Sequence, residues 1–179
     1  MAARAKRHER TVARESALAL LYSSDITDES VADIVDAGQY PADDIEFAPY
    51  AEALVRGVQA HRAEIDERLS STSENWTLDR MPVVDRAILR LAVYEMIYVD
   101  EVPVSVTINE AVELAKAYGG EDDSSRFVNG VLGRIAAGID AEASSEVADS
   151  AQGSNVEDTE VSSEVVGDEI LEGSEPKED

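Results

Sequence analysis

The stretch VVDRAILRLAVYEMIY, from Val83 to Tyr98, decides the fold of this chain because it is the most apolar segment of the sequence. Its apolar side chains recur every three or four residues, with few polar positions between them, as in a helix that is buried on most sides. Pro82 stands directly before it, where a residue without an N–H suits the first turn of a helix. The pattern therefore predicts a central core helix over these residues.

On the N-terminal side of this stretch, three more segments carry apolar residues at helical spacing. The first begins in a group of basic residues. The second is short, with Thr27 as its predicted cap and Gly38 near its predicted end. The third extends from about residue 44 to about residue 70, and Gly57 marks a bend or break within it.

On the C-terminal side, Ser105 is the predicted cap of a helix over residues 106–118, and Asp122 or Asp123 is the predicted cap of a last helix over about 124–137. No segment sustains the strict alternation of polar and apolar residues that is typical of a strand. The predicted fold class is therefore all-α.

Charge divides the 179 residues unevenly: 39 are acidic and 15 are basic, which gives a net charge of -24. Residues 140–179 hold 14 acidic side chains, one basic side chain and no aromatic residue. Such a composition cannot bury enough apolar surface to offset the entropy of ordering. We therefore expect a disordered acidic tail over 140–179, and a helical domain over 1–139 with a basic arm at about 1–14.

The sequence lacks the patterns of the common enzyme classes. It has no cysteine, and its two histidines have no metal-site spacing. It has neither a glycine-rich phosphate loop nor a nucleophile elbow. We predict that the chain is not an enzyme and takes no metal or cofactor. It also has no apolar run long enough to span a bilayer and no secretory signal, so we expect a cytoplasmic protein.

The basic arm is the first feature that favours a specific function. Within the first 15 residues, five basic side chains face two acidic ones. Positive charge at a helix start opposes the helix dipole, so these residues are unfavourable for the helix alone. A frayed, solvated helix end is one interpretation. RNA phosphate as a partner explains the group better, because arginine bonds phosphate oxygens in pairs.

Four stretches follow one another as they do in a known family: ARESALALLY (13–22), DRAILRLAVYE (85–95), VTINEAVELAK (106–116) and RFVNGVL (126–132). Across about residues 8–139 the chain resembles the bacterial NusB family of transcription antitermination factors. The resemblance implies two small helical bundles packed together, without catalysis or cofactor. It also implies binding to the boxA element of leader and ribosomal RNA transcripts, in support of rRNA transcription. The implied partners are the small-subunit ribosomal protein NusE and an elongation complex with other Nus factors.

The resemblance also implies roles for individual residues. Arg10 and Arg14 match the basic RNA-binding start of the family, and in this sequence the basic group extends to Lys6 and Arg7. Thr11 stands where family members often carry a further arginine.

The remaining predicted site residues lie further along the chain. Arg126 and Phe127 match a segment that helps to form the RNA surface. Glu95 and Asp123 match acidic positions of the ribosomal-protein interface. Tyr22 is either a packed aromatic residue or a base-stacking one, and we include it in the predicted RNA site.

Two alternatives remain open from the sequence. One is a homodimeric scaffold whose RNA surface is masked by self-association. The other is a structural module of the kind found as an N-terminal domain of RNA cytosine methyltransferases, with no independent role in RNA binding.

Overall fold

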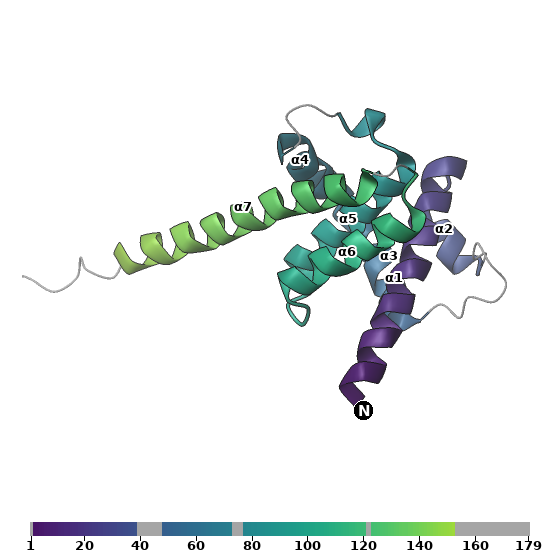
Figure 1. Cartoon of the computed structure of the whole chain (residues 1–179), viewed down its shortest axis with the longest axis horizontal. Coiled ribbons are helices and arrows are strands. Elements are labelled where there is room, and N and C mark those ends of the chain that lie inside the picture. Colours follow the sequence, from purple (N-terminus) through teal and green to yellow (C-terminus); the bar gives the residue numbers. More distant parts are fainter. Residues whose placement is uncertain (1, 39–47, 73–76, 121–122, 153–179) are drawn as a thin grey trace, which may run out of the picture. The chain divides into compact units, whose positions relative to one another are not determined.

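The computed structural model describes residues 2–38, 48–72, 77–120 and 123–152. These residues form helices and connections and contain no strand, which confirms the all-α prediction. The elements, labelled in Figure 1, are α1 (Ala2–Thr27), α2 (Val31–Asp36), α3 (Pro49–Ala60), α4 (Arg62–Thr72), a 3₁₀ turn η1 (Leu78–Arg80), α5 (Val83–Tyr98), α6 (Val104–Tyr118) and α7 (Ser124–Gln152).

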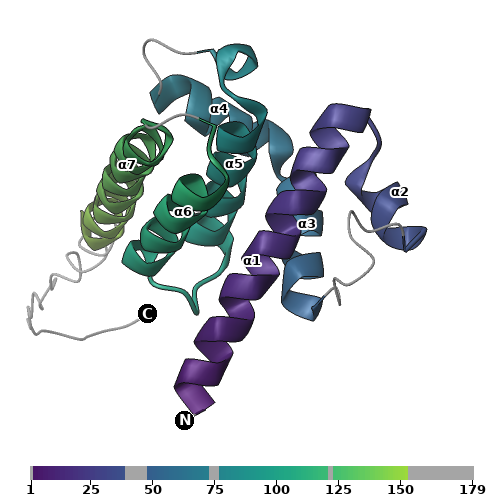
Figure 2. The ribbon, with the colours of Figure 1, turned by 45° about the vertical axis from the view of Figure 1, so that its right-hand side comes forward.

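Helix α5 lies at the centre of the compact unit that residues 1–144 form. It packs against α1, α3, α4 and α6. In Figure 2, α1, α2 and α3 lie on one side of α5, and α4, α6 and the start of α7 lie on the other. The two expected bundles are therefore present, and α5 joins them.

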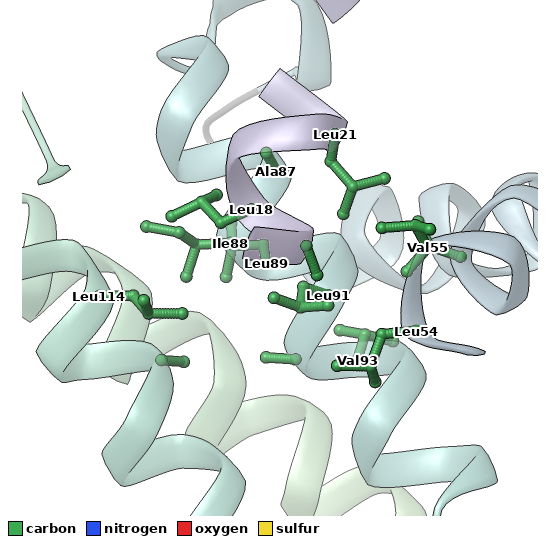
Figure 3. Close-up of a cluster of buried hydrophobic side chains, with 14 of the residues drawn as sticks. Leu18, Leu21, Leu54, Val55, Ala87, Ile88, Leu89, Leu91, Val93 and Leu114 are labelled. Carbon is green, nitrogen blue, oxygen red and sulfur yellow. The ribbon is translucent and has the colours of Figure 1, made fainter. Parts of the chain in front are cut away.

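The core is continuous across these helices because α5 is apolar on several faces. Figure 3 shows Leu91 of α5 between Leu21 of α1 and Leu54 of α3, and Ile88 of α5 next to Leu18 of α1. All five side chains are buried. Burying an aliphatic side chain of this size stabilises a fold by about 1.5–3 kcal/mol, so this cluster determines how the helices pack.

Two helix caps differ from the sequence prediction. The side chain of Ser30 accepts the N–H of Ala32 and so caps α2, whereas Thr27 is the last residue of α1. Helix α6 begins two residues earlier than predicted, with Pro103 at its N-cap, so Ser105 lies within the first turn. Proline has a fixed φ and no N–H, and both properties suit a helix start.

The predicted long segment is two helices, α3 and α4, with the break at His61 rather than at Gly57. Gly57 lies inside α3, where a Cβ atom would overlap the ring of Tyr94. This glycine thus permits α3 and α5 to approach each other closely. The first residues of the predicted segment, 44–47, lie outside the described residues.

Helix α7 continues beyond residue 137, its predicted end, to Gln152. Residues 138–152 include four alanines, the residue that favours helices most. Arg68 of α4 contacts Glu142 at 3.1 Å. The predicted tail therefore starts inside this helix, and its residues 153–179 lie outside the described part of the chain. Among the described residues, no helix is long and apolar enough to cross a membrane.

Candidate nucleic-acid interface

Arg14 and Glu95, for which the family resemblance implied contacts with RNA and with a protein partner, contact each other inside the fold. Arg14 is 4% exposed and Glu95 is 2% exposed. The Nε atom of Arg14 donates to both carboxylate oxygens of Glu95, at 2.9 and 3.1 Å. As a result, neither side chain is presented at the surface of the described structure.

The carboxylate of Glu95 has two further partners in the interior. Thr107 of α6 donates to it at 2.9 Å, and the hydroxyl of Tyr50 in α3 donates to it as well. Burial and this hydrogen bond raise the pKa of Tyr50 above its usual range. A buried charge is tolerated only when it is paired and hydrogen-bonded, and Glu95 meets both conditions. The cluster thus joins α1, α3, α5 and α6.

Glu110 of α6 extends this cluster toward the surface. It accepts hydrogen bonds from Nη1 of Arg14 at 3.2 Å and from the hydroxyl of Thr11 at 2.7 Å. Its other oxygen lies 3.8 Å from Nη2 of Arg7. Thr11 stands where the family often has arginine. Its side chain donates a hydrogen bond to the carboxylate of Glu110 and adds no positive charge to the arm.

The predicted cations of the arm that reach solvent are Lys6, Arg7 and Arg10, on the first turns of α1. These turns extend beyond the other helices in Figures 1 and 2. Lys6 and Arg10 approach the same carboxylate oxygen of Glu101, at 3.6 and 2.7 Å. The guanidinium of Arg10 also lies over the ring of Tyr50, 5.0 Å from its centroid. The structure thus brings Lys6 and Arg10 together at Glu101, whereas Arg7 pairs with Glu110.

Tyr22 lies about 18 Å further along α1 than Arg10, at 1.5 Å per residue. Its ring is exposed and lines an apolar groove of about 450 Å³ together with Val12, Val84 and Tyr118. Glu15, Ser16, Leu18 and Ala19 complete the lining.

Most of this groove was not predicted from the sequence. A usable signal is present in α1, because Val12, Ala19 and Tyr22 recur at helical spacing on a face distinct from the core stripe. Tyr118 is the last residue of α6, and nothing in its local pattern places it beside α1.

The remaining predicted residues lie at the start of α7. Arg126 and Asp123 are both exposed and pair with each other at 3.1 Å. The ring of Phe127 is half-buried and packs against the core. The hydroxyl of Ser124 donates to Asp85 at the start of α5, next to Val84 of the groove.

The described residues bring together no three His, Asp or Glu side chains that could hold a metal ion. What they present is a cationic helix start, an apolar groove and an exposed ion pair. These features suit binding to phosphate and to a protein surface rather than the transfer of a chemical group.

Comparison with known sequences gives a consistent picture. A model of the NusB family matches residues 11–137. The transcription antitermination protein NusB of Bacillus subtilis (strain 168) is 45% identical over 132 residues, which cover 74% of this chain and 98% of that protein. Lys6, Arg7 and Arg10 precede the residues that the family model matches.

Solved structures agree with the sequence matches. T. maritima NusB has a TM-score of 0.63 and 37% identity, over 71% of this chain and 89% of that one. A crystal structure of the antitermination factors NusB and NusE in complex with dsRNA contains a chain with a TM-score of 0.59 and 28% identity, over 70% of this chain and 94% of that one.

Proposed function

The chain belongs to the NusB family, and from this premise we propose that it is a transcription antitermination factor that binds boxA RNA together with NusE. It would do so in the cytoplasm, as part of an elongation complex with other Nus factors, and so support transcription of rRNA. A relative of the same fold is found with NusE and dsRNA, which supports both partners.

The observation that carries the RNA proposal is the cluster of Lys6, Arg7 and Arg10. A chain with a net charge of -24 repels RNA over most of its surface, so phosphate contacts need a local cationic site. The arm is such a site, and Arg14 contributes by holding α1 in place rather than by contacting phosphate. Phosphate contacts position the RNA, whereas sequence preference needs contacts with bases.

For base contacts we propose Tyr22, Arg126 and Phe127, which lie away from the arm. An exposed aromatic ring stacks on an unpaired base, and the loss of one such contact costs about 1–3 kcal/mol. Arg126 can exchange its ion pair with Asp123 for a contact with RNA, because exposed ion pairs are weak.

For NusE we propose the apolar groove at Tyr118; Tyr22 lines its α1 side and so lies where the two proposed partners would meet. An exposed apolar patch next to polar residues is typical of a protein interface. Asp123 is exposed and remains a proposed contact with this partner, whereas buried Glu95 would act only indirectly, by holding α1, α3 and α6 against α5. The competing proposal is that a second copy of this chain occupies the groove and forms a homodimer.

The RNA proposal is tested with a double substitution, Lys6→Ala and Arg7→Ala, in the full chain. Single-stranded RNA loses affinity with salt at a log–log slope of about -0.7 per neutralised phosphate, so the slope should flatten by about 1.4. Fluorescence anisotropy with boxA RNA and a scrambled RNA measures both affinity and slope. The weakening should be similar for the two RNAs.

The matched control replaces Arg56 and Arg134, two exposed arginines of α3 and α7, with alanine. It removes the same charge and should leave the slope unchanged. Equal slopes for wild type and the arm variant would show that the arm is not the RNA site.

The NusE proposal is tested with Tyr118→Ala. Truncating a central aromatic anchor of an interface typically costs about 2 kcal/mol or more, so the dissociation constant for NusE should rise about 30-fold in calorimetry. Ile26→Ala is the control, because Ile26 is exposed but does not line the groove. Sedimentation of the free protein tests the competing homodimer, which would dissociate in the Tyr118 variant.

A further inference from the structure

Glu101, in the connection between α5 and α6, holds two cations of the arm at once. Its Oε2 atom accepts a hydrogen bond from Nη2 of Arg10 at 2.7 Å and lies 3.6 Å from Nζ of Lys6. The side chain of Glu101 is 71% exposed, so it reaches the arm from solvent rather than from the core. Arg10 and Lys6, in this order, lower the pKa of its carboxyl.

The two acidic residues that face the arm differ in how they are held. Glu110 accepts hydrogen bonds from Arg14 and Thr11, so a substitution of Glu110 would disturb the interior cluster. Glu101 contacts only arm residues among the ion pairs and hydrogen bonds described. Its effect on the molecule is therefore exerted through the arm.

A carboxylate and a phosphate offer the same groups to a guanidinium, namely two charged oxygens that accept parallel hydrogen bonds. The carboxylate of Glu101 thus lies where a phosphate oxygen would lie if RNA bound Lys6 and Arg10. While the carboxylate of Glu101 is paired with Lys6 and Arg10, these two cations are less available to RNA.

We propose that Glu101 occupies the phosphate-binding groups of the arm in the RNA-free chain, and that RNA must displace it, so that Glu101 sets the affinity of the arm for RNA. This inference rests on the proposed function, because it takes RNA as the ligand of the arm. Exposed ion pairs are individually weak, so several phosphates of one RNA strand displace the carboxylate where a single anion does so poorly. Arg10 remains oriented by the ring of Tyr50 after the exchange.

The test compares Glu101→Gln with Glu113→Gln in the full chain. Glu113 is a matched control because its side chain is also 71% exposed and pairs with a lysine, Lys116, at 2.7 Å. Both variants remove one negative charge, but Glu113 has no described contact with the arm. Circular dichroism checks that both variants remain helical.

Anisotropy at low salt should show that Glu101→Gln binds boxA RNA about three- to tenfold more tightly than wild type, the range expected when weak exposed ion pairs no longer compete. The gain should shrink as salt rises, because salt screens exposed charges. Glu113→Gln should stay close to wild type. Unchanged or weaker binding by Glu101→Gln, or an equal gain in both variants, would overturn the inference.

This result is separable from the proposed function. Wild-type binding to boxA RNA with no gain in Glu101→Gln refutes the role of Glu101 alone. Absence of RNA binding by wild type and by both variants refutes the proposed function, and the inference with it.

Discussion

At Arg14, a single guanidinium group bonds the carboxylates of Glu95 and Glu110 and is closed off from solvent. Taking these charges out of water is costly, and the mutual hydrogen bonds offset that cost only while all partners are present. Tyr50 and Thr107 satisfy the remaining acceptor positions of Glu95. Arg14 is therefore a structural residue whose loss affects stability first.

Arg14→Ala should lower the free energy of unfolding by about 3–5 kcal/mol, because it leaves Glu95 buried without its cation. Urea unfolding followed by circular dichroism measures this change. Arg10→Ala is the comparison, since its partner Glu101 is 71% exposed and the ion pair should contribute no more than about 1 kcal/mol. Similar midpoints for Arg14→Ala and wild type would contradict the structural role.

At the scale of elements, helix α1 serves two purposes along its length. Its later turns place Ala17, Leu20 and Leu21 in the core, and its first turns carry the cations. The other helices hold α1 by close packing and by charge pairs. Near the end of α1, Asp25 forms ion pairs with three arginines of α4 and α5, namely Arg62, Arg86 and Arg90. Burial alone would raise the pKa of Asp25, but these arginines together lower it.

The close approach of α3 and α5 can be tested at Gly57. A methyl group there overlaps the ring of Tyr94, so Gly57→Ala should destabilise the fold by about 1–3 kcal/mol. Gly133→Ala in α7 is the control, because open space surrounds that position. Alanine should stabilise α7 by up to about 1 kcal/mol. Thermal unfolding of the two variants should therefore shift in opposite directions, and a shared direction would argue against the Gly57 contact.

For the whole molecule, the distribution of charge matters more than its total. Against a net charge of -24, the arm concentrates basic residues at one end of α1. Residues 153–179 add ten acidic side chains and one basic side chain. A tethered acidic segment has a high effective concentration near any cationic site that it can reach, of millimolar order for short flexible linkers.

A chain that ends at Gln152 should accordingly bind RNA more tightly than the full chain at low salt and equally well at high salt. The melting temperature should not change, because the removed segment has too few apolar residues to contribute a core. Anisotropy at two salt concentrations measures the RNA affinity, and a thermal scan measures the melting temperature. Identical RNA affinity at low salt would remove the tail as a competitor and leave Glu101 and Glu110 as the acidic residues that face the arm.

The sequence by itself determined the all-helical fold, the central place of the Val83–Tyr98 stretch and the position of the basic arm. These features follow from the spacing of apolar residues and from local charge, which act within one helix or between neighbouring turns. The start of α7 was predictable for the same reason.

Only the tertiary structure decided what each charged residue does. Arg14 and Arg10 are one turn apart in the same basic run, yet Arg14 is buried against Glu95, 81 residues away, and Arg10 meets Glu101 at the surface. The groove likewise joins Tyr22 to Tyr118 across two helices. Local sequence patterns hold no information about such pairings, because the free energy of a buried charge depends on the partners that packing brings beside it.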